Sequence, residues 1–133
     1  ILSRYVSEDH EINKSLIENA LSNCISSFEG YGKEICKVHS AMVSDQDKIR
    51  KISFQNIDTA NEKLIALFNI DLTKAISHED WREMSILFQK RHLIMHRLGV
   101  IDEEYVRRSG DHEAIIGKKI NVNIDEITVW FKI

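Results

Sequence analysis

Helical spacing of apolar residues, with no proline to interrupt it, is the feature that most constrains the fold of this chain. Proline is absent from all 133 residues, so no ring clash or missing N–H forces a helix to kink. Between residues 8 and 28, apolar side chains recur mostly at steps of three to five residues, as on one face of an amphipathic helix: Ile12, Leu16, Leu21, Cys24, Ile25 and Phe28. We therefore predict a first helix here, and we expect Gly30 and Gly32 to end it.

The next part of the chain predicts two more helices with an extended segment between them. Apolar residues at looser helical spacing predict a second helix over about residues 33–49. Residues 52–55 then favour an extended backbone. Helical spacing returns in a third segment, which contains Ile57, Ala60, Leu64, Leu67 and Phe68.

The clearest helix is predicted over about residues 79–98. Ser77 and Asp80 offer N-caps, and Gly99 stands at the position that glycine favours after a helix end. The remaining chain predicts a helical turn over 103–108, a glycine-bounded loop over 109–117, a brief extended piece over 118–123, and a last helix that starts near Asp125 and Glu126 and includes Ile127, Trp130 and Phe131.

Together these patterns predict an all-α fold, a helical bundle of four to five helices with one minor extended element. With 133 residues and 43% hydrophobic content, the chain is long enough to bury one core, so we expect a single domain over residues 1–133. Because the sequence begins at Ile1 rather than Met and ends at Ile133 within an apolar pattern, this domain is also compatible with a piece of a longer chain.

Charge and cysteine content narrow the classes of function. Eighteen Lys and Arg against 21 Asp and Glu give a net charge of −3, which lacks the basic excess of proteins that hold duplex DNA through its phosphates. Cys24 and Cys36 are too few for a zinc site or a disulfide framework, which favours a cytoplasmic location. The sequence contains no apolar run of about 18 residues and no signal-peptide pattern, so we expect no membrane partner.

Four basic residues lie within the apolar pattern of the clearest helix: Arg91, His92, His96 and Arg97. At about 100° per residue, one apolar stripe forms and Arg91 falls inside it; the stripe consists of Met84, Leu87, Phe88, Met95 and Leu98. His92 and His96 share one edge of that stripe. The sequence allows two interpretations of Arg91. In the first, its stem lies on apolar neighbours and its guanidinium is in water. In the second, the stripe meets another protein surface, where this charge has a binding or catalytic role.

The stretch "RHLIMH", residues 91–96, matches the R-x4-6-H motif of the HEPN superfamily. Its form is the frequent one in which a polar residue, here His92, follows the arginine. The surrounding segments "SFQNIDTANEKLIALFNIDL", "WREMSILFQKRHLIMHRLGVIDEEYVRRSGD" and "GKKINVNIDEI" also resemble standalone HEPN domains of ribonuclease and defence proteins. The resemblance covers roughly residues 50–128.

This resemblance implies a HEPN-like helical bundle that dimerises face to face, with paired motifs around a two-fold axis and metal-independent cleavage of RNA. Five residues of helix separate Arg91 from His96 by about 140°, so one protomer assembles the pair poorly, whereas two protomers bring two of each around one phosphate. One His96 would take the proton of the ribose 2′-hydroxyl and the other would protonate the departing 5′-oxygen, because histidine titrates near neutral pH.

The remaining cations take supporting roles in this hypothesis. Arg91 would hold the phosphate and offset the charge that develops on its oxygens. His92 would orient the phosphate or stabilise the loop, and Arg97, Arg107 and Arg108 would guide the RNA backbone. The product would end in a cyclic phosphate, and we expect no cofactor. The resemblance further implies a toxin–antitoxin or phage-defence context, in which an antitoxin or a fused partner domain restrains the enzyme.

Two alternatives remain open from the sequence. In the first alternative, the chain is a catalytically silent HEPN module that serves dimerisation or the binding of a partner or nucleic acid within a larger protein. Alternatively, His92 and His96 form an i, i+4 pair of metal ligands, completed by acidic or histidine side chains of the following loop: Asp111, His112 and Glu113. Leu93 occupies the place where an HExxH motif has its glutamate, so this pattern specifies no metal.

Overall fold

The fold is all-α, as predicted. A computed structural model describes the backbone of residues 2–128 and the side chains of residues 9–41 and 43–128. Within that range there is no strand, and the extended piece predicted over 118–123 contributes only an isolated antiparallel bridge between Val100 and Lys119. The helices are α1 (Leu2–Val38), η1 (Ser40–Met42), α2 (Gln46–Arg50), α3 (Ile57–Phe68), η2 (Leu72–Lys74), α4 (His78–His96), α5 (Glu103–Ser109) and α6 (Ile124–Ile127), of which η1 and η2 are 3₁₀ turns.

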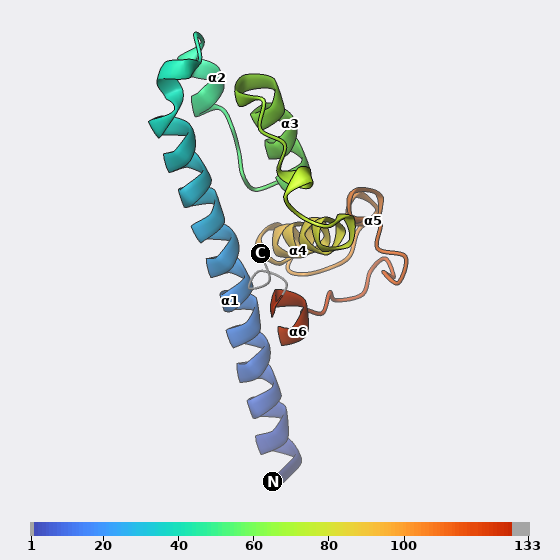
Figure 1. Ribbon diagram of the computed structural model, residues 1–133. Coiled ribbons are helices and arrows are strands. Elements are labelled where there is room, and N and C mark those ends of the chain that lie inside the picture. The colour runs from blue at the N-terminus through green and yellow to red at the C-terminus, as the bar shows by residue number, and fades with distance from the viewer. Residues whose placement is uncertain (1, 129–133) are drawn as a thin grey trace.

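Helix α1 is much longer than predicted, because neither glycine ends it. It runs for 37 residues along the molecule, with α2 and α3 beside its C-terminal end and α6 beside its middle (Figure 1). Gly32 is required for packing: a Cβ there would lie 2.7 Å from the ring of Phe54. The glycine therefore lets a buried aromatic ring approach the helix backbone, and it does not end the helix.

The second helix predicted over 33–49 is also wrong. Its first residues belong to α1, and the chain then turns before the single short helix α2. Asp45 explains this break, because its side chain accepts hydrogen bonds from the backbone N–H groups of Asp47 and Lys48 and so caps a new helix. Of the residues 52–55 predicted as extended, the first two have no regular secondary structure and the last two lie in a turn, and the segment places Ile52 and Phe54 in the core.

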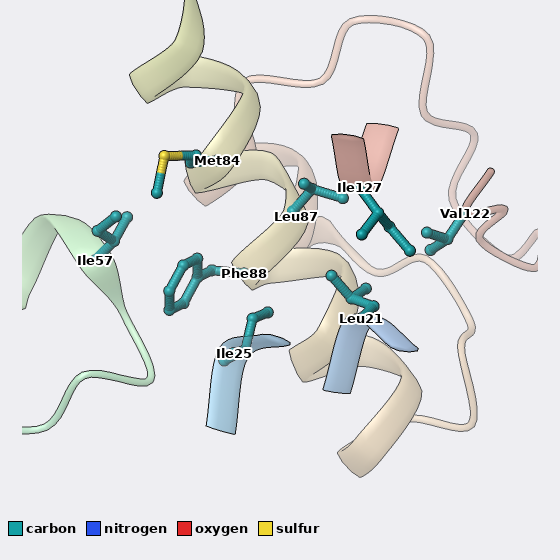
Figure 2. Packing of buried hydrophobic residues seen from close by; sticks show 8 residues of the cluster. All are labelled: Leu21, Ile25, Ile57, Met84, Leu87, Phe88, Val122 and Ile127. Carbon is teal, nitrogen blue, oxygen red and sulfur yellow. The ribbon is translucent and has the colours of Figure 1, made fainter. Parts of the chain in front are cut away.

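Helix α4 lies at the centre of the core and runs across α1 (Figure 1). One of its faces contributes to a cluster with α1, α3 and the segment that contains α6 (Figure 2), which consists of Leu21, Ile25, Ile57, Met84, Leu87, Phe88, Val122 and Ile127. Its opposite face contributes Leu93 to a second cluster with Ile101, Tyr105 and Ile120. Cys36, Ile52, Phe54, Ala60 and Leu64 form a third cluster between α1 and α3.

The predicted ends of α4 and α5 are confirmed to within about two residues, and α3 spans the predicted apolar segment from Ile57 to Phe68. Ser77 caps α4 by accepting a hydrogen bond from the N–H of Asp80. At the other end, Leu98 and Gly99 both adopt left-handed backbone, with φ of 54° and 75°, and the Gly99 N–H donates to the Leu93 carbonyl at 2.9 Å.

The last helix begins as predicted, close to Asp125. Asn123 caps α6, and a reciprocal hydrogen bond joins the Glu126 side chain to the Asn123 N–H. Trp130 and Phe131, which we predicted in the same helix, lie outside the described residues. Over the described range, no helix combines the length with the apolar content that spanning a membrane requires.

Candidate functional site

The apolar stripe predicted on α4 divides into a buried half and an exposed half. Met84, Leu87 and Phe88 are buried, the last with 1% of its surface exposed, whereas 55% of Met95 and 82% of Leu98 are exposed. The apolar stripe thus continues beyond the part of α4 that the core of this chain covers. Helix α4 runs across α1 (Figure 1), and the cluster that joins the two helices contains Met84, Leu87 and Phe88 but not Met95, while Leu98 lies beyond the end of α4.

His92 and His96 lie side by side on the exposed half of α4, as their four-residue spacing predicts. Their ring centroids are 4.9 Å apart, and the ring planes are tilted by 50°. Both side chains are exposed. Partial burial lowers the pKa of His92 below its ordinary value, and the charges of His96, Arg108 and Arg97 lower it further, while Glu104 opposes this shift. Such a histidine favours the neutral form that accepts a proton.

Arg91 lies on a different side of α4, between that helix and α1. It is half-buried, and its Nη2 donates a long hydrogen bond of 3.5 Å to the Ser26 hydroxyl. Its Nε is buried and has no hydrogen-bond acceptor within the described part of the chain. The separation expected from the five-residue spacing is thus present: within this chain, Arg91 and the two histidines do not converge on one point.

Two of the three arginines predicted to guide RNA border the histidine pair. The Arg97 Nε lies 3.7 Å from the Asp102 carboxylate, and Arg108 lies 2.7 Å from Glu104. Both arginines are exposed, and both influence the pKa of His92. Arg107 instead lines a shallow pocket with three carboxylates, those of Asp102, Glu103 and Glu104. That acidic surrounding makes Arg107 the least suited of the three to a phosphate.

Among the loop residues considered as further metal ligands, Asp111 has another role. Asp111 accepts a hydrogen bond of 2.8 Å from the Tyr105 hydroxyl and another from the backbone N–H of Glu113. Burial and this carboxylate together raise the pKa of the Tyr105 phenol well above its ordinary value. Nowhere in the described range do three or more His, Cys, Asp or Glu side chains gather as a metal-binding group. Within that range, the chain places no third ligand beside the two histidines.

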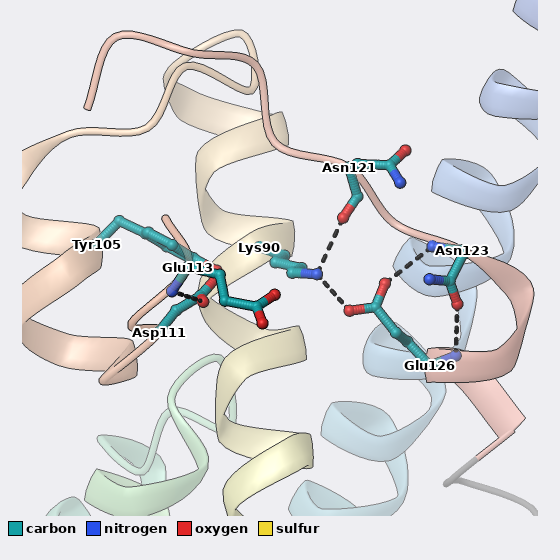
Figure 3. Close-up of polar contacts among 7 residues, drawn as sticks. All are labelled: Lys90, Tyr105, Asp111, Glu113, Asn121, Asn123 and Glu126. Atoms are coloured by element: carbon teal, nitrogen blue, oxygen red, sulfur yellow. Dashed lines mark hydrogen bonds and ion pairs between the residues drawn. The ribbon is translucent and has the colours of Figure 1, made fainter. Parts of the chain in front are cut away.

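Lys90 is a buried charge that the sequence patterns did not single out. Its ammonium donates a hydrogen bond of 2.9 Å to the Asn121 carbonyl and forms an ion pair with Glu126 (Figure 3). A signal was present, because Lys90 stands three residues from both Leu87 and Leu93, which are buried. A lysine between two buried neighbours on a helix requires an acceptor, yet only the fold shows which one.

Comparison of the chain with protein-family models, with curated proteins and with solved structures gave no match. A functional argument for this protein therefore starts from its own side chains. The strongest group among those described is the exposed pair His92 and His96, bordered by Arg97 and Arg108 at the end of α4.

Proposed function

We propose that this chain is a metal-independent endoribonuclease of the HEPN type that acts in a toxin–antitoxin or phage-defence context. The observation that carries the proposal is the contact between the exposed imidazoles of His92 and His96, 4.9 Å apart at their ring centroids. Cleavage of RNA through its own 2′-hydroxyl needs a base, an acid and positive charge near the phosphate, and two histidines beside cationic side chains can supply all three. The motif "RHLIMH" supplies the same residues from the sequence.

The reaction is an internal transfer of the phosphate. The ribose 2′-hydroxyl loses its proton to a base, its oxygen forms a bond to phosphorus, and the bond from phosphorus to the 5′-oxygen breaks. An acid then donates a proton to the departing oxygen. The products are a 2′,3′-cyclic phosphate and a free 5′-hydroxyl, and imidazoles suit both proton transfers because their pKa lies near neutral pH.

Arg91 and the exposed end of the apolar stripe support a homodimer. An unpaired buried donor costs roughly 1–3 kcal/mol, so the Arg91 Nε gains from an acceptor that RNA or a second chain would bring. Met95 lies on the same face of α4 as Arg91, and Leu98 follows just beyond the end of that helix; both present apolar surface to solvent. A second copy that covers this face would bring two R-x4-6-H motifs together.

Light scattering tests the dimer. We expect a mass near twice the 15.5 kDa of one chain at micromolar concentration. Replacement of Met95 by glutamate should shift that mass toward one chain, because it places a charge in the covered apolar face. The same substitution at Ile12, an exposed apolar residue of α1, is the matched control. Wild-type protein with the mass of one chain would contradict the dimer.

Cleavage of total RNA in excess chelator tests the activity. We expect fragments with cyclic phosphate ends, and a rate lowered about a hundredfold or more in His96→Ala, the usual contribution of a general acid or base. His10→Ala is the matched control, since His10 is an exposed histidine on α1. Absence of cleavage by the wild type, or a dependence on added divalent ions, would refute the proposal.

Arg91→Ala separates an enzyme from a binding module. In an enzyme, this variant loses cleavage and also binds RNA more weakly, because it lacks a phosphate contact. If the wild type cleaves no RNA and Arg91→Ala instead loses dimerisation, the motif serves assembly. The chain is then the silent module.

A further inference from the structure

We propose, resting on the ribonuclease function above, that one protomer contains the complete acid–base pair: His92 is the general base and His96 of the same chain is the general acid. The two His96 residues of a dimer then need not share one phosphate. The assignment departs from the sequence-based hypothesis, in which His92 only orients the phosphate and the second proton-transfer group comes from the other chain.

The positions of the two rings carry this inference. In cleavage by the 2′-hydroxyl, the attacking and departing oxygens lie on one phosphorus, so base and acid must reach the same phosphate. Four residues along a helix advance about 6 Å, and the rings of His92 and His96 are 4.9 Å apart and tilted. Two ring nitrogens at this spacing can each reach one oxygen of a phosphate that lies over the pair.

The surroundings of the pair assign the two roles. Charged groups of α4, of α5 and of the turn between them act on His92: the cations His96, Arg97 and Arg108, and the anion Glu104. Partial burial and the three cations outweigh the carboxylate, so His92 favours the neutral state that a base needs. With His92 as the base, His96 is the other imidazole of the pair and takes the role of the acid.

The proton transfers balance within one protomer. Neutral His92 accepts the proton of the 2′-hydroxyl while the bond from the 2′-oxygen to phosphorus forms. As the bond to the 5′-oxygen breaks, protonated His96 donates its proton to that oxygen. Exchange of protons with water then restores neutral His92 and protonated His96, so the cycle uses no metal, oxidant or cofactor.

Arg97 and Arg108 supply the positive charge at this site. Both are bound to carboxylates at the surface, where ion pairs contribute only about 0–1 kcal/mol. A phosphate, which accepts two hydrogen bonds from one guanidinium, can therefore displace a carboxylate. Arg97 is the more available of the two, since its Nε is 3.7 Å from Asp102.

Mixed dimers test whether the pair belongs to one chain. Two differently tagged copies are produced together, and the mixed species is purified through both tags. In a dimer of wild type with His96→Gln, an acid–base pair within one chain keeps one intact site and about half of the wild-type rate. If the two His96 residues must act together, the same mixed dimer loses about a hundredfold or more.

A second mixed dimer excludes pairing between chains. His92→Gln combined with His96→Gln leaves no chain with both histidines, so we expect no cleavage above that of either variant alone. About half of the wild-type rate would show that His92 of one chain works with His96 of the other, and would overturn the inference. His10→Gln paired with wild type is the control, and thermal melting confirms that substitutions at these exposed positions leave the fold intact.

Failure of this inference differs from failure of the proposed function. A His92→Gln homodimer that cleaves RNA near the wild-type rate would refute the role of His92, while the ribonuclease itself stands. Wild-type protein that cleaves no RNA would refute the ribonuclease. If the protein is active at the mass of one chain and His92→Gln and His96→Gln each abolish that activity, the pair within one protomer is supported directly.

Discussion

The two halves of α4 belong to one continuous helix, yet they contribute differently to the molecule. The first half places Met84, Leu87 and Phe88 in the main core, whereas the second half presents His92, Met95 and His96 to solvent. The helical periodicity of apolar residues does not distinguish them. The difference arises because α1 crosses α4 (Figure 1) and its residues Leu21 and Ile25 pack with the first half alone, which leaves the second half available for chemistry or for a partner.

Among the substitutions that test this difference, truncation of a core side chain should lower the free energy of unfolding most. Phe88→Ala removes a ring that packs edge-to-face on Phe28 with centroids 5.7 Å apart, and we expect a loss of about 3–5 kcal/mol in the free energy of unfolding. Met95→Ala on the exposed half should change the free energy of unfolding of the single chain by less than about 0.5 kcal/mol, when both variants are measured at a concentration too low for dimers. Denaturant unfolding measures both, and similar losses would contradict the division of the helix.

Removal of the ion-pair partner of Lys90 should give the second-largest loss in the free energy of unfolding. Glu126→Ala leaves a buried ammonium without its counter-ion, and we expect a loss of about 2–4 kcal/mol in the free energy of unfolding. Asp125→Ala is the matched control, because it removes an exposed carboxylate from the same turn of helix. Equal losses in the two variants, measured by thermal unfolding, would mean that charge at the start of α6 matters and the ion pair does not.

The end of α4 should become more stable when Leu98 is replaced. This residue has a φ of 54°, a conformation that costs an L-residue about 1 kcal/mol and glycine almost nothing. We therefore expect Leu98→Gly to raise the free energy of unfolding by about 1 kcal/mol in chemical denaturation. Leu98→Ala keeps the backbone cost, so it should give no such gain, and a gain in both variants would point to the exposed side chain instead.

The smallest expected effect is a change in the titration of His92. In the wild type, nuclear magnetic resonance should place the pKa of His92 below its ordinary value of 6.5. His96→Gln removes one of the neighbouring cations, so the pKa of His92 should rise while remaining lowered by burial. Since the folded state lowers this pKa, His92 stabilises the fold above its ordinary pKa, and this contribution is lost as the pH falls through the lowered value.

Local signals in the sequence predicted much of the fold. The helices α3, α4 and α5 follow from apolar spacing together with capping residues such as Ser77, whose effect extends only a few positions along the chain. The length of α1 could not be predicted in this way. Gly32 resembles a helix end locally, and only the ring of Phe54, from a distant turn, shows why the glycine is needed.

The candidate site was also predictable only where it depends on neighbours along one helix. The proximity of His92 and His96 follows from helix geometry alone. The direction of Arg91 toward Ser26 depends on where α1 crosses, and the acidic surroundings of Arg107 depend on how α5 turns back. Lys90 needed a partner from the C-terminal segment, so its burial was foreseeable and its acceptor was not.

The contact between Lys90 and Glu126 also bears on the order in which the protein folds. A single turn such as α6, four residues long, is too short to persist as an isolated helix. Its ion pair joins positions 36 residues apart, and the lysine reaches its final place only when α4 is already formed. We infer that the segment around α6 docks after the central helix.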